Sequence, residues 1–186
     1  MAVRHRRQII GITGFSAVGK STLAKHLGEE LGIGVFSLGN YQRAEFAAYG
    51  PPEIYHSIFG YDKTYYGRWP TYIAEISKGM TDAGIVVEGI YSSGFLDLMR
   101  QRFSDARIEM IRIVASPDRR VELFMKKTGL PEREARVQLA SLDAIKEDVG
   151  LNALMGRIDT SIINNTDLAS FLRSGEQTVT HLLRRG

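Results

Sequence analysis

The stretch that decides the fold is Gly14-Phe15-Ser16-Ala17-Val18-Gly19-Lys20-Ser21, which matches the pattern G-x-x-x-x-G-K-S/T at every fixed position. It follows an apolar run over 8–13 and opens a helical pattern over 20–31. Glycines let a backbone wrap closely around phosphate oxygens, and the amides and dipole at a helix N-terminus attract the anion. The stretch therefore predicts a phosphate-binding loop between a strand and a helix.

The parts of this loop have separate expected roles in binding ATP and Mg²⁺, the two cofactors that the motif implies. Lys20 is expected to bridge the β- and γ-phosphates, and the Ser21 hydroxyl to bind the metal ion. The other positions are expected to offer backbone N–H groups to phosphate oxygens. The expected nucleotide-binding residues are Gly14, Ser16, Ala17, Val18, Gly19, Lys20, Ser21 and Thr22.

Short apolar runs alternate with helical patterns along the rest of the chain. Runs that are apolar on both faces are typical of strands buried inside a layered fold. The alternation predicts a three-layer α/β P-loop fold, with a five-stranded parallel sheet and helices on both faces. The expected strands are 8–13, 34–38, 84–88, 107–115 and 160–164, and the expected helices are 20–31, 41–49, 70–83, 94–103, 117–127, 131–149 and 167–173.

Composition narrows the class of protein. The chain has 186 residues, 44% of them hydrophobic and 24% charged, which fits one domain spanning 1–186. It contains no cysteine, which excludes disulfides, thiolate metal sites and a cysteine nucleophile. Its four histidines form no ligand-spaced pair. The net charge of +3 suits an anionic ligand but is too small to indicate a nucleic acid by itself.

The first residues place basic side chains before an apolar run, as a signal peptide does. The run is too short for that role and leads straight into the glycine-rich loop, so we interpret it as the first strand. No other stretch approaches the length that crosses a membrane. The expected location is the cytoplasm, with no membrane partner.

Ile85-Val86-Val87-Glu88-Gly89 is an apolar strand that ends in a carboxylate, which is the Walker B pattern with glutamate in the acidic position. In a P-loop fold this strand lies beside the first strand, so Glu88 is expected near the Mg²⁺ held by Ser21. Glu88 is therefore a candidate for both catalysis and metal binding, holding a water of the ion.

These features resemble the nucleoside monophosphate kinases, especially the compact cytidylate and archaeal adenylate kinases, and the related dephospho-coenzyme A kinases. The resemblance covers nearly the whole chain. Ser37-Leu38-Gly39-Asn40-Tyr41-Gln42-Arg43 resembles the segment in which such kinases have Gly-Asp-x-x-Arg, whose arginine grips the acceptor phosphate. It implies that Arg43 binds the acceptor phosphate, while Asn40 departs from the family by standing where the aspartate is expected. Ile90 stands where several cytidylate kinases have another arginine, so that contact is missing or supplied elsewhere.

Ala115-Ser116-Pro117-Asp118-Arg119-Arg120 is similar to the start of the family's lid, which closes over ATP and holds several arginines. The resemblance implies a lid near 126–136 whose cations neutralise charge on the transferred phosphoryl group. The segment 162–166 resembles the final strand and turn, which lie near the adenine. The candidate catalytic residues are Lys20, Glu88, Arg120, Lys126, Arg133 and Arg136.

An irregular segment, 50–67, lies inside an expected acceptor-binding insertion at about 40–83. Seven aromatic residues crowd into and just after it: Tyr55, Phe59, Tyr61, Tyr65, Tyr66, Trp69 and Tyr72. Such a set either stacks on a base or packs a small helical subdomain. Tyr66 and Trp69 join Asn40 and Arg43 as candidate substrate-binding residues.

The acceptor is the open question. An alcohol acceptor benefits from a carboxylate that takes its proton, whereas a phosphate acceptor is already ionised at pH 7. Because an amide cannot act as a base, Asn40 with Arg43 favours phosphoryl transfer to a nucleoside monophosphate or a similar small phosphorylated metabolite. The alternatives are a hydroxyl of a nucleic acid or modified base, such as a hydroxymethyl pyrimidine in DNA, with Glu88 or Asp62 as base; dephospho-coenzyme A; and a regulatory NTPase. The oligomeric state stays open.

Overall fold

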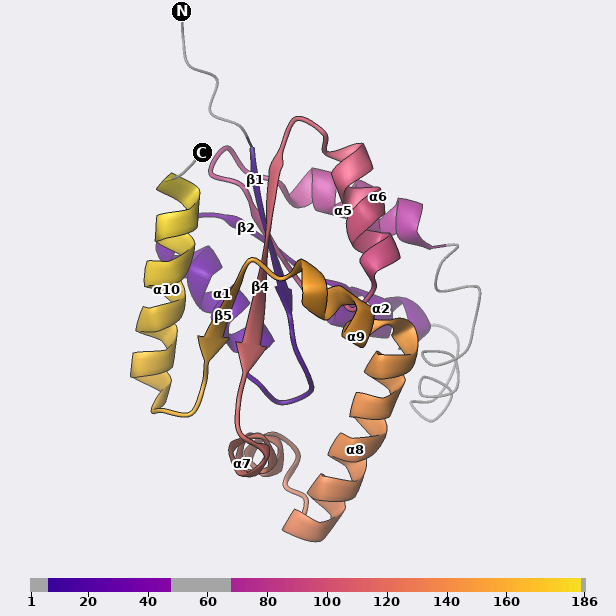
Figure 1. Cartoon of the computed structure of the whole chain (residues 1–186), viewed down its shortest axis with the longest axis vertical. Coiled ribbons are helices and arrows are strands. Elements are labelled where there is room, and N and C mark those ends of the chain that lie inside the picture. Colours follow the sequence, from indigo (N-terminus) through magenta and orange to yellow (C-terminus); the bar gives the residue numbers. More distant parts are fainter. Residues whose placement is uncertain (1–6, 48–67, 185–186) are drawn as a thin grey trace, which may run out of the picture.

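The computed structural model describes residues 7–47 and 68–184. Its five strands form one parallel sheet in the order β2-β3-β1-β4-β5, with helices on both faces (Figure 1). The predicted three-layer α/β fold is therefore confirmed. The strands are β1 (Gln8–Thr13), β2 (Gly34–Ser37), β3 (Ile85–Glu88), β4 (Arg107–Val114) and β5 (Thr160–Ile163).

The predicted helices differ from those of the structure mainly near their ends, and the helical residues over 151–157 have no predicted counterpart. The helix α1 has the predicted bounds, whereas α2 begins inside the expected second strand and α10 continues well beyond 173. The described helices are α1 (Lys20–Leu31), α2 (Leu38–Ala47), α5 (Trp69–Gly79), α6 (Ser93–Arg102), α7 (Pro117–Thr128), α8 (Glu132–Val149), α9 (Leu151–Leu154), the 3₁₀ turn η1 (Met155–Arg157) and α10 (Leu168–Arg184).

The extra length of α10 has a packing cause. Phe171, Val179 and Leu182 lie on one face of the helix and are buried in the core. Gly175 lies on the same face, where an added Cβ would be 2.3 Å from Leu23 of α1. The two helices therefore approach closely along this apolar stripe, which holds α10 against the sheet to its end.

The strand β1 lies at the centre of the sheet, and all six of its residues are buried. It pairs with β3 on one side and β4 on the other, with Ile12 opposite both Glu88 and Ile111. The predicted neighbourhood of the first and Walker B strands is thus confirmed. The carboxyl ends of these strands, where the glycine-rich loop and Glu88 lie, meet at one edge of the sheet.

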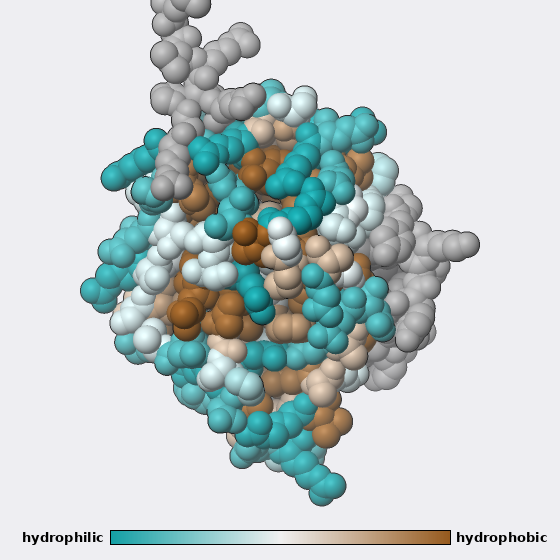
Figure 2. All heavy atoms as spheres, viewed as in Figure 1, coloured by the Kyte–Doolittle hydropathy of each residue, from teal (hydrophilic) through white to brown (hydrophobic). Residues whose placement is uncertain are grey.

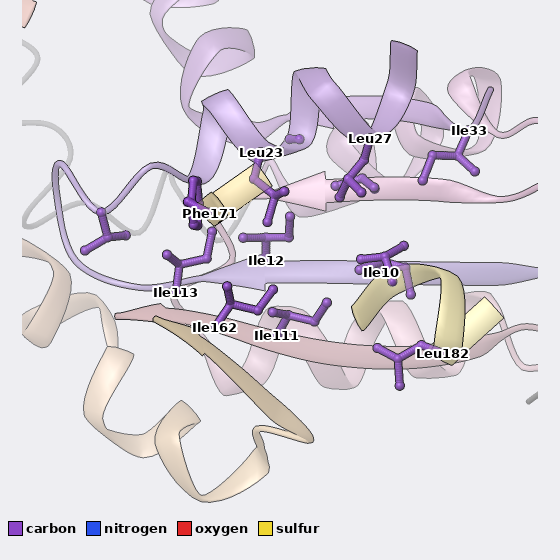
Figure 3. Packing of buried hydrophobic residues seen from close by; sticks show 14 of the residues in the cluster. Ile10, Ile12, Leu23, Leu27, Ile33, Ile111, Ile113, Ile162, Phe171 and Leu182 are labelled. Atoms are coloured by element: carbon purple, nitrogen blue, oxygen red, sulfur yellow. The ribbon is translucent and has the colours of Figure 1, made fainter. Parts of the chain in front are cut away.

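Two apolar cores cover the two faces of the sheet. Figure 3 shows the first, in which Leu23 and Leu27 of α1 and Phe171 and Leu182 of α10 meet the isoleucines of β1, β4 and β5. The second packs α5 and α6 on the opposite face through residues that include Tyr72, Phe95 and Met99. Burial on both faces explains why the strand runs are apolar throughout.

The helices α7 and α8 form a third, smaller unit beyond the carboxyl ends of the strands (Figure 1). They pack on each other through Val121, Phe124, Ala135 and Leu139, and Ala17 of the glycine-rich loop packs against this cluster. The α7–α8 unit is thus placed to touch a ligand bound at the loop.

The molecular surface that faces the viewer in Figure 2 is largely hydrophilic, with apolar residues scattered between the polar ones.

Candidate active site

The glycine-rich loop between β1 and α1 turns through backbone conformations that favour glycine. Gly14 and Gly19 have φ values of 134° and 98°, and Ala17 has a φ of 57°. A Cβ at Gly14 would be 2.4 Å from the carbonyl oxygen of Ile113 in β4. Glycine is therefore required at this position, both for its backbone angle and for the close approach of β4.

The far side of the loop is anchored by the end of β5. The buried side chain of Asn164 donates from Nδ2 to the carbonyl oxygen of Val18 at 2.9 Å. This bond fixes the loop directly before α1, whose N-terminal amides are available to an anion. The segment 162–166, which is predicted to lie near the adenine, therefore contacts the glycine-rich loop through Asn164.

Lys20 lies at the start of α1 and is 8% exposed. Its ammonium donates to the carbonyl oxygen of Phe15 within the loop, at 2.7 Å. Burial lowers the pKa of Lys20 to about 8, while the nearby Glu88 carboxylate opposes that shift and Arg120 adds to it. The ammonium thus stands inside the loop, in a poorly hydrated environment where an added anion is strongly attracted.

The candidate metal ligands Ser21 and Glu88 lie together, as the sequence predicts. The Ser21 hydroxyl donates to Glu88 Oε1 at 3.0 Å, and the Ser37 hydroxyl donates to the same oxygen. Hydroxyl and carboxylate oxygens are the hard ligands that suit Mg²⁺, which usually takes one or two protein ligands and completes its shell with phosphates and water. No cluster of three or more acidic or histidine ligands occurs within 7–47 and 68–184, and this small donor set therefore fits a phosphate-bound Mg²⁺ rather than a protein-caged ion.

The α7–α8 unit contacts the loop through Arg120, a predicted site residue, and through Asp143 and Lys146, which the sequence does not single out. Asp143 Oδ1 in α8 accepts from the Ser16 amide at 3.4 Å, and Lys146 donates to the Ser16 hydroxyl. Arg120 of α7 donates to the Ser16 carbonyl oxygen at 2.9 Å and to both oxygens of Asp143. Ser16 is thus held through its amide, carbonyl and hydroxyl groups by one cluster on the α7–α8 unit.

Tyr91 completes this side of the site. The ammonium groups of Lys20 and Lys146 lie 5.7 and 5.2 Å from the centroid of its ring. Two lysine side chains therefore share one aromatic ring beside the loop, a contact that favours their charged forms. Tyr91 lies three residues after Glu88, the last residue of the Walker B strand, so its position near the site can be inferred from the sequence.

On the acceptor side, a chain of bonds runs outward from Glu88 along α2. The Ser37 hydroxyl, which donates to Glu88, accepts a hydrogen bond from the backbone amide of Asn40 at 3.2 Å. The Arg43 guanidinium in turn donates to the Asn40 side-chain oxygen. The candidates Asn40 and Arg43 therefore lie together, next to the predicted metal site.

The aromatic candidates divide. Tyr72 is fully buried in the core of the second face, where it contacts Phe95 edge-on, and Trp69 packs on Phe95 with ring centroids 5.7 Å apart. For these two residues the packing interpretation of the aromatic segment describes what the structure shows. Tyr66 and the other aromatic residues of 50–67 lie outside the described residues.

Of the four predicted lid cations, Arg120 contacts the loop and the other three do not among the described contacts. Lys126 is bonded to Glu122 at 2.8 Å, Arg136 to Glu132 and Asp118, and Arg133 is exposed. For Arg133 and Arg136 the reason is their position near the start of α8. Arg136 lies about 15 Å along the helix axis from Lys146, which is the residue of α8 that reaches the loop.

Sequence comparison identifies no relatives: no protein-family model matches the chain, and no curated protein matches it. Within 7–47 and 68–184, none of the helices combines the length and the apolar character needed to cross a membrane.

Comparison of the structure with solved structures finds similarity over nearly the whole chain. A gluconokinase from Sinorhizobium meliloti superposes with a TM-score of 0.59 at 21% identity, covering 98% of this chain and 96% of that one. A shikimate kinase from Bacteroides thetaiotaomicron gives a TM-score of 0.60 at 16% identity, covering 96% and 98%. An uncharacterized protein from Eubacterium ventriosum gives 0.64 at 15% identity, covering 97% and 99%. The predicted resemblance to P-loop kinases is thereby confirmed at the level of the fold, which this chain shares with them.

Proposed function

We propose that this chain is an ATP- and Mg²⁺-dependent kinase that transfers a phosphoryl group to a small anionic metabolite. The observation that carries the proposal is the convergence of Lys20, the Ser21–Glu88 pair and the lid cation Arg120 around one glycine-rich loop. Phosphoryl transfer requires positioning and charge neutralisation more than covalent chemistry. This site supplies cations, oxygen ligands and backbone amides in one place.

The residues divide the work. The loop amides and the Lys20 ammonium bind the donor phosphates, and Lys20 stabilises the charge that develops on the transferred group. Ser21 and Glu88 hold Mg²⁺, which when bound offsets phosphate charge and orients the donor. Arg120 ties the lid to the loop, so that lid closure over the nucleotide excludes water and limits wasteful hydrolysis of ATP.

The acceptor is a nucleoside monophosphate or a similar phosphorylated metabolite in this proposal. The support is the pair formed by Asn40 and Arg43, which lies next to Glu88 through Ser37. A guanidinium recognises a phosphate bidentately, and Asn40 orients it without acting as a base. The acceptor-binding unit is proposed to span about 40–83, and the lid about 126–136 extended along α8 to Lys146.

The test is ATP consumption with Mg²⁺ against a panel of nucleoside monophosphates, nucleosides, dephospho-coenzyme A, gluconate, shikimate and DNA containing hydroxymethyl pyrimidines. Acceptor-dependent turnover with one monophosphate, lost in Lys20→Ala, is the expected result. Turnover only with a hydroxyl acceptor would replace the proposed acceptor while keeping the kinase. Slow ATP hydrolysis that no acceptor accelerates would count against the kinase itself.

A further inference from the structure

Lys146 occupies a place in the site that the proposed function leaves unexplained. It belongs to α8, but its ammonium donates to the Ser16 hydroxyl inside the glycine-rich loop, across a sequence separation of 130 residues. Its neighbour Asp143 is occupied by both Arg120 and the Ser16 amide. Within the described part of the chain, no carboxylate forms an ion pair with Lys146.

A second cation stands close by. Lys20 and Lys146 lie over the same Tyr91 ring, with ammonium–centroid distances of 5.7 and 5.2 Å. Two ammonium groups in a poorly hydrated site repel each other, which favours the neutral form of one of them, whereas an anion bound between them favours the charged form of both. The pair is therefore suited to a negatively charged ligand, and the loop beside it has the form of a phosphate-binding loop.

We propose that Lys146 is a second phosphate-binding lysine, carried into the site by α8, which exchanges the Ser16 hydroxyl for an oxygen of the terminal phosphate of a nucleoside triphosphate. This inference rests on the proposed function and names the lid residue that contacts the donor. It adds Lys146 to the cations to which the resemblance gave this task, among them Arg120, Lys126, Arg133 and Arg136.

The protonation of Lys146 supplies a specific signature of this exchange. Burial and the charge of Lys20 lower the pKa of Lys146 to about 6, with Arg120 adding to the shift and Asp143 and Glu88 opposing it. At pH 8 the free protein therefore holds this side chain largely neutral. A phosphate oxygen bound to it favours the charged form, so that binding of ATP takes up about one proton at this residue.

The experiment is calorimetric titration of the full chain with MgATP at pH 8, in two buffers of different ionisation enthalpy. Lys146→Met is expected to weaken ATP binding roughly ten- to a hundredfold, since a charge-assisted hydrogen bond is lost. Its proton uptake is expected to fall below that of the wild type by about one proton per ATP. Binding of AMP, which lacks the terminal phosphates, is expected to change little.

Two further variants separate a ligand from a structural residue. Lys146→Arg keeps a charge that does not titrate, so it is expected to bind ATP nearly as well as wild type while losing the same proton uptake. A residue with a packing role alone would not produce that combination. Lys25→Met is the matched control, because Lys25 is an exposed lysine of α1 that pairs with Glu29, and it is expected to leave both affinity and uptake unchanged.

The outcomes are distinguishable. Wild-type affinity and proton uptake in Lys146→Met would overturn this inference and leave the proposed kinase intact. If Lys146→Met does not fold, Lys146→Arg decides, and unchanged proton uptake in that variant would overturn the inference. A wild-type chain that binds no ATP would overturn the proposed function and this inference together.

Discussion

Arg120 and Asp143 are joined by two hydrogen bonds, of 2.8 and 2.6 Å, that connect α7 to α8 directly above the glycine-rich loop. Both side chains are shielded, with 14% and 20% of their side-chain surface exposed. Each also bonds to the backbone of Ser16. The pair therefore holds α7 and α8 together and ties them to the loop at the same time.

Asp143→Ala is expected to lower the free energy of unfolding by about 1–3 kcal/mol, because Arg120 is left partly buried without its carboxylate. Denaturant unfolding followed by circular dichroism measures the change. Glu132→Ala is the matched control, since it removes an exposed partner of Arg136 and is expected to cost less than about 1 kcal/mol. Equal losses in the two variants would show that burial of the Arg120 pair adds nothing.

Lys20→Ala is expected to reduce phosphoryl transfer about a hundredfold or more while leaving the fold intact, because it removes the cation inside the loop. The measurement is the initial rate at saturating MgATP with the acceptor identified by the panel. Lys25→Ala changes an exposed lysine of the same helix and is expected to retain full activity. Full activity in Lys20→Ala would contradict the proposed mechanism.

Glu88→Gln is expected to raise the Mg²⁺ concentration needed for half-maximal activity about tenfold or more, because an amide binds the ion more weakly than a carboxylate does. A Mg²⁺ titration of the initial rate measures it. Glu109→Gln provides a control at another buried carboxylate, one that pairs with Arg107 in β4. The same Mg²⁺ dependence in Glu88→Gln and wild type would remove Glu88 from the metal site.

Arg43→Ala is expected to raise the KM for a phosphorylated acceptor about tenfold or more, with little change in the KM for ATP, because the proposed acceptor-phosphate contact is lost. Steady-state kinetics with each substrate varied in turn measures both constants. Lys78→Ala removes a cation of α5 that pairs with Glu75, and it is expected to leave the acceptor KM unchanged. An unchanged acceptor KM in Arg43→Ala would place the acceptor elsewhere.

The stability of the chain is expected to rise with pH between about 6 and 10. Lys146 has a folded-state pKa of about 6 and Lys20 one of about 8, both below the ordinary value of 10.5, so the unfolded chain binds more protons across this range. Thermal unfolding at a series of pH values measures the slope. The slope of stability against pH is expected to be smaller in Lys146→Met than in the wild type. The difference is expected to be clearest between pH 6 and 8, where Lys20 contributes less to the slope. A slope identical to wild type would mean that Lys146 is charged in the folded protein.

The local parts of this protein are written in its sequence. A glycine-rich loop between an apolar run and a helix is recognisable because neighbouring residues alone create its backbone angles and its helix N-terminus. The Walker B strand is recognisable because its apolar run and the carboxylate that ends it are also adjacent in the sequence. Once a parallel P-loop sheet is inferred, Glu88 must lie near Ser21, and the structure gives that pair a hydrogen bond of 3.0 Å.

The tertiary structure alone decided which charged residues of α8 face the loop. A helical pattern shows which side of α8 is apolar, but not how far along its axis the helix meets the loop. That point is set by the packing of α7 on α8 and by the route of α8 toward α9, and it selects Asp143 and Lys146 while Arg136 pairs with surface carboxylates. Contacts across 127 and 130 residues depend on such packing, and no local pattern encodes them.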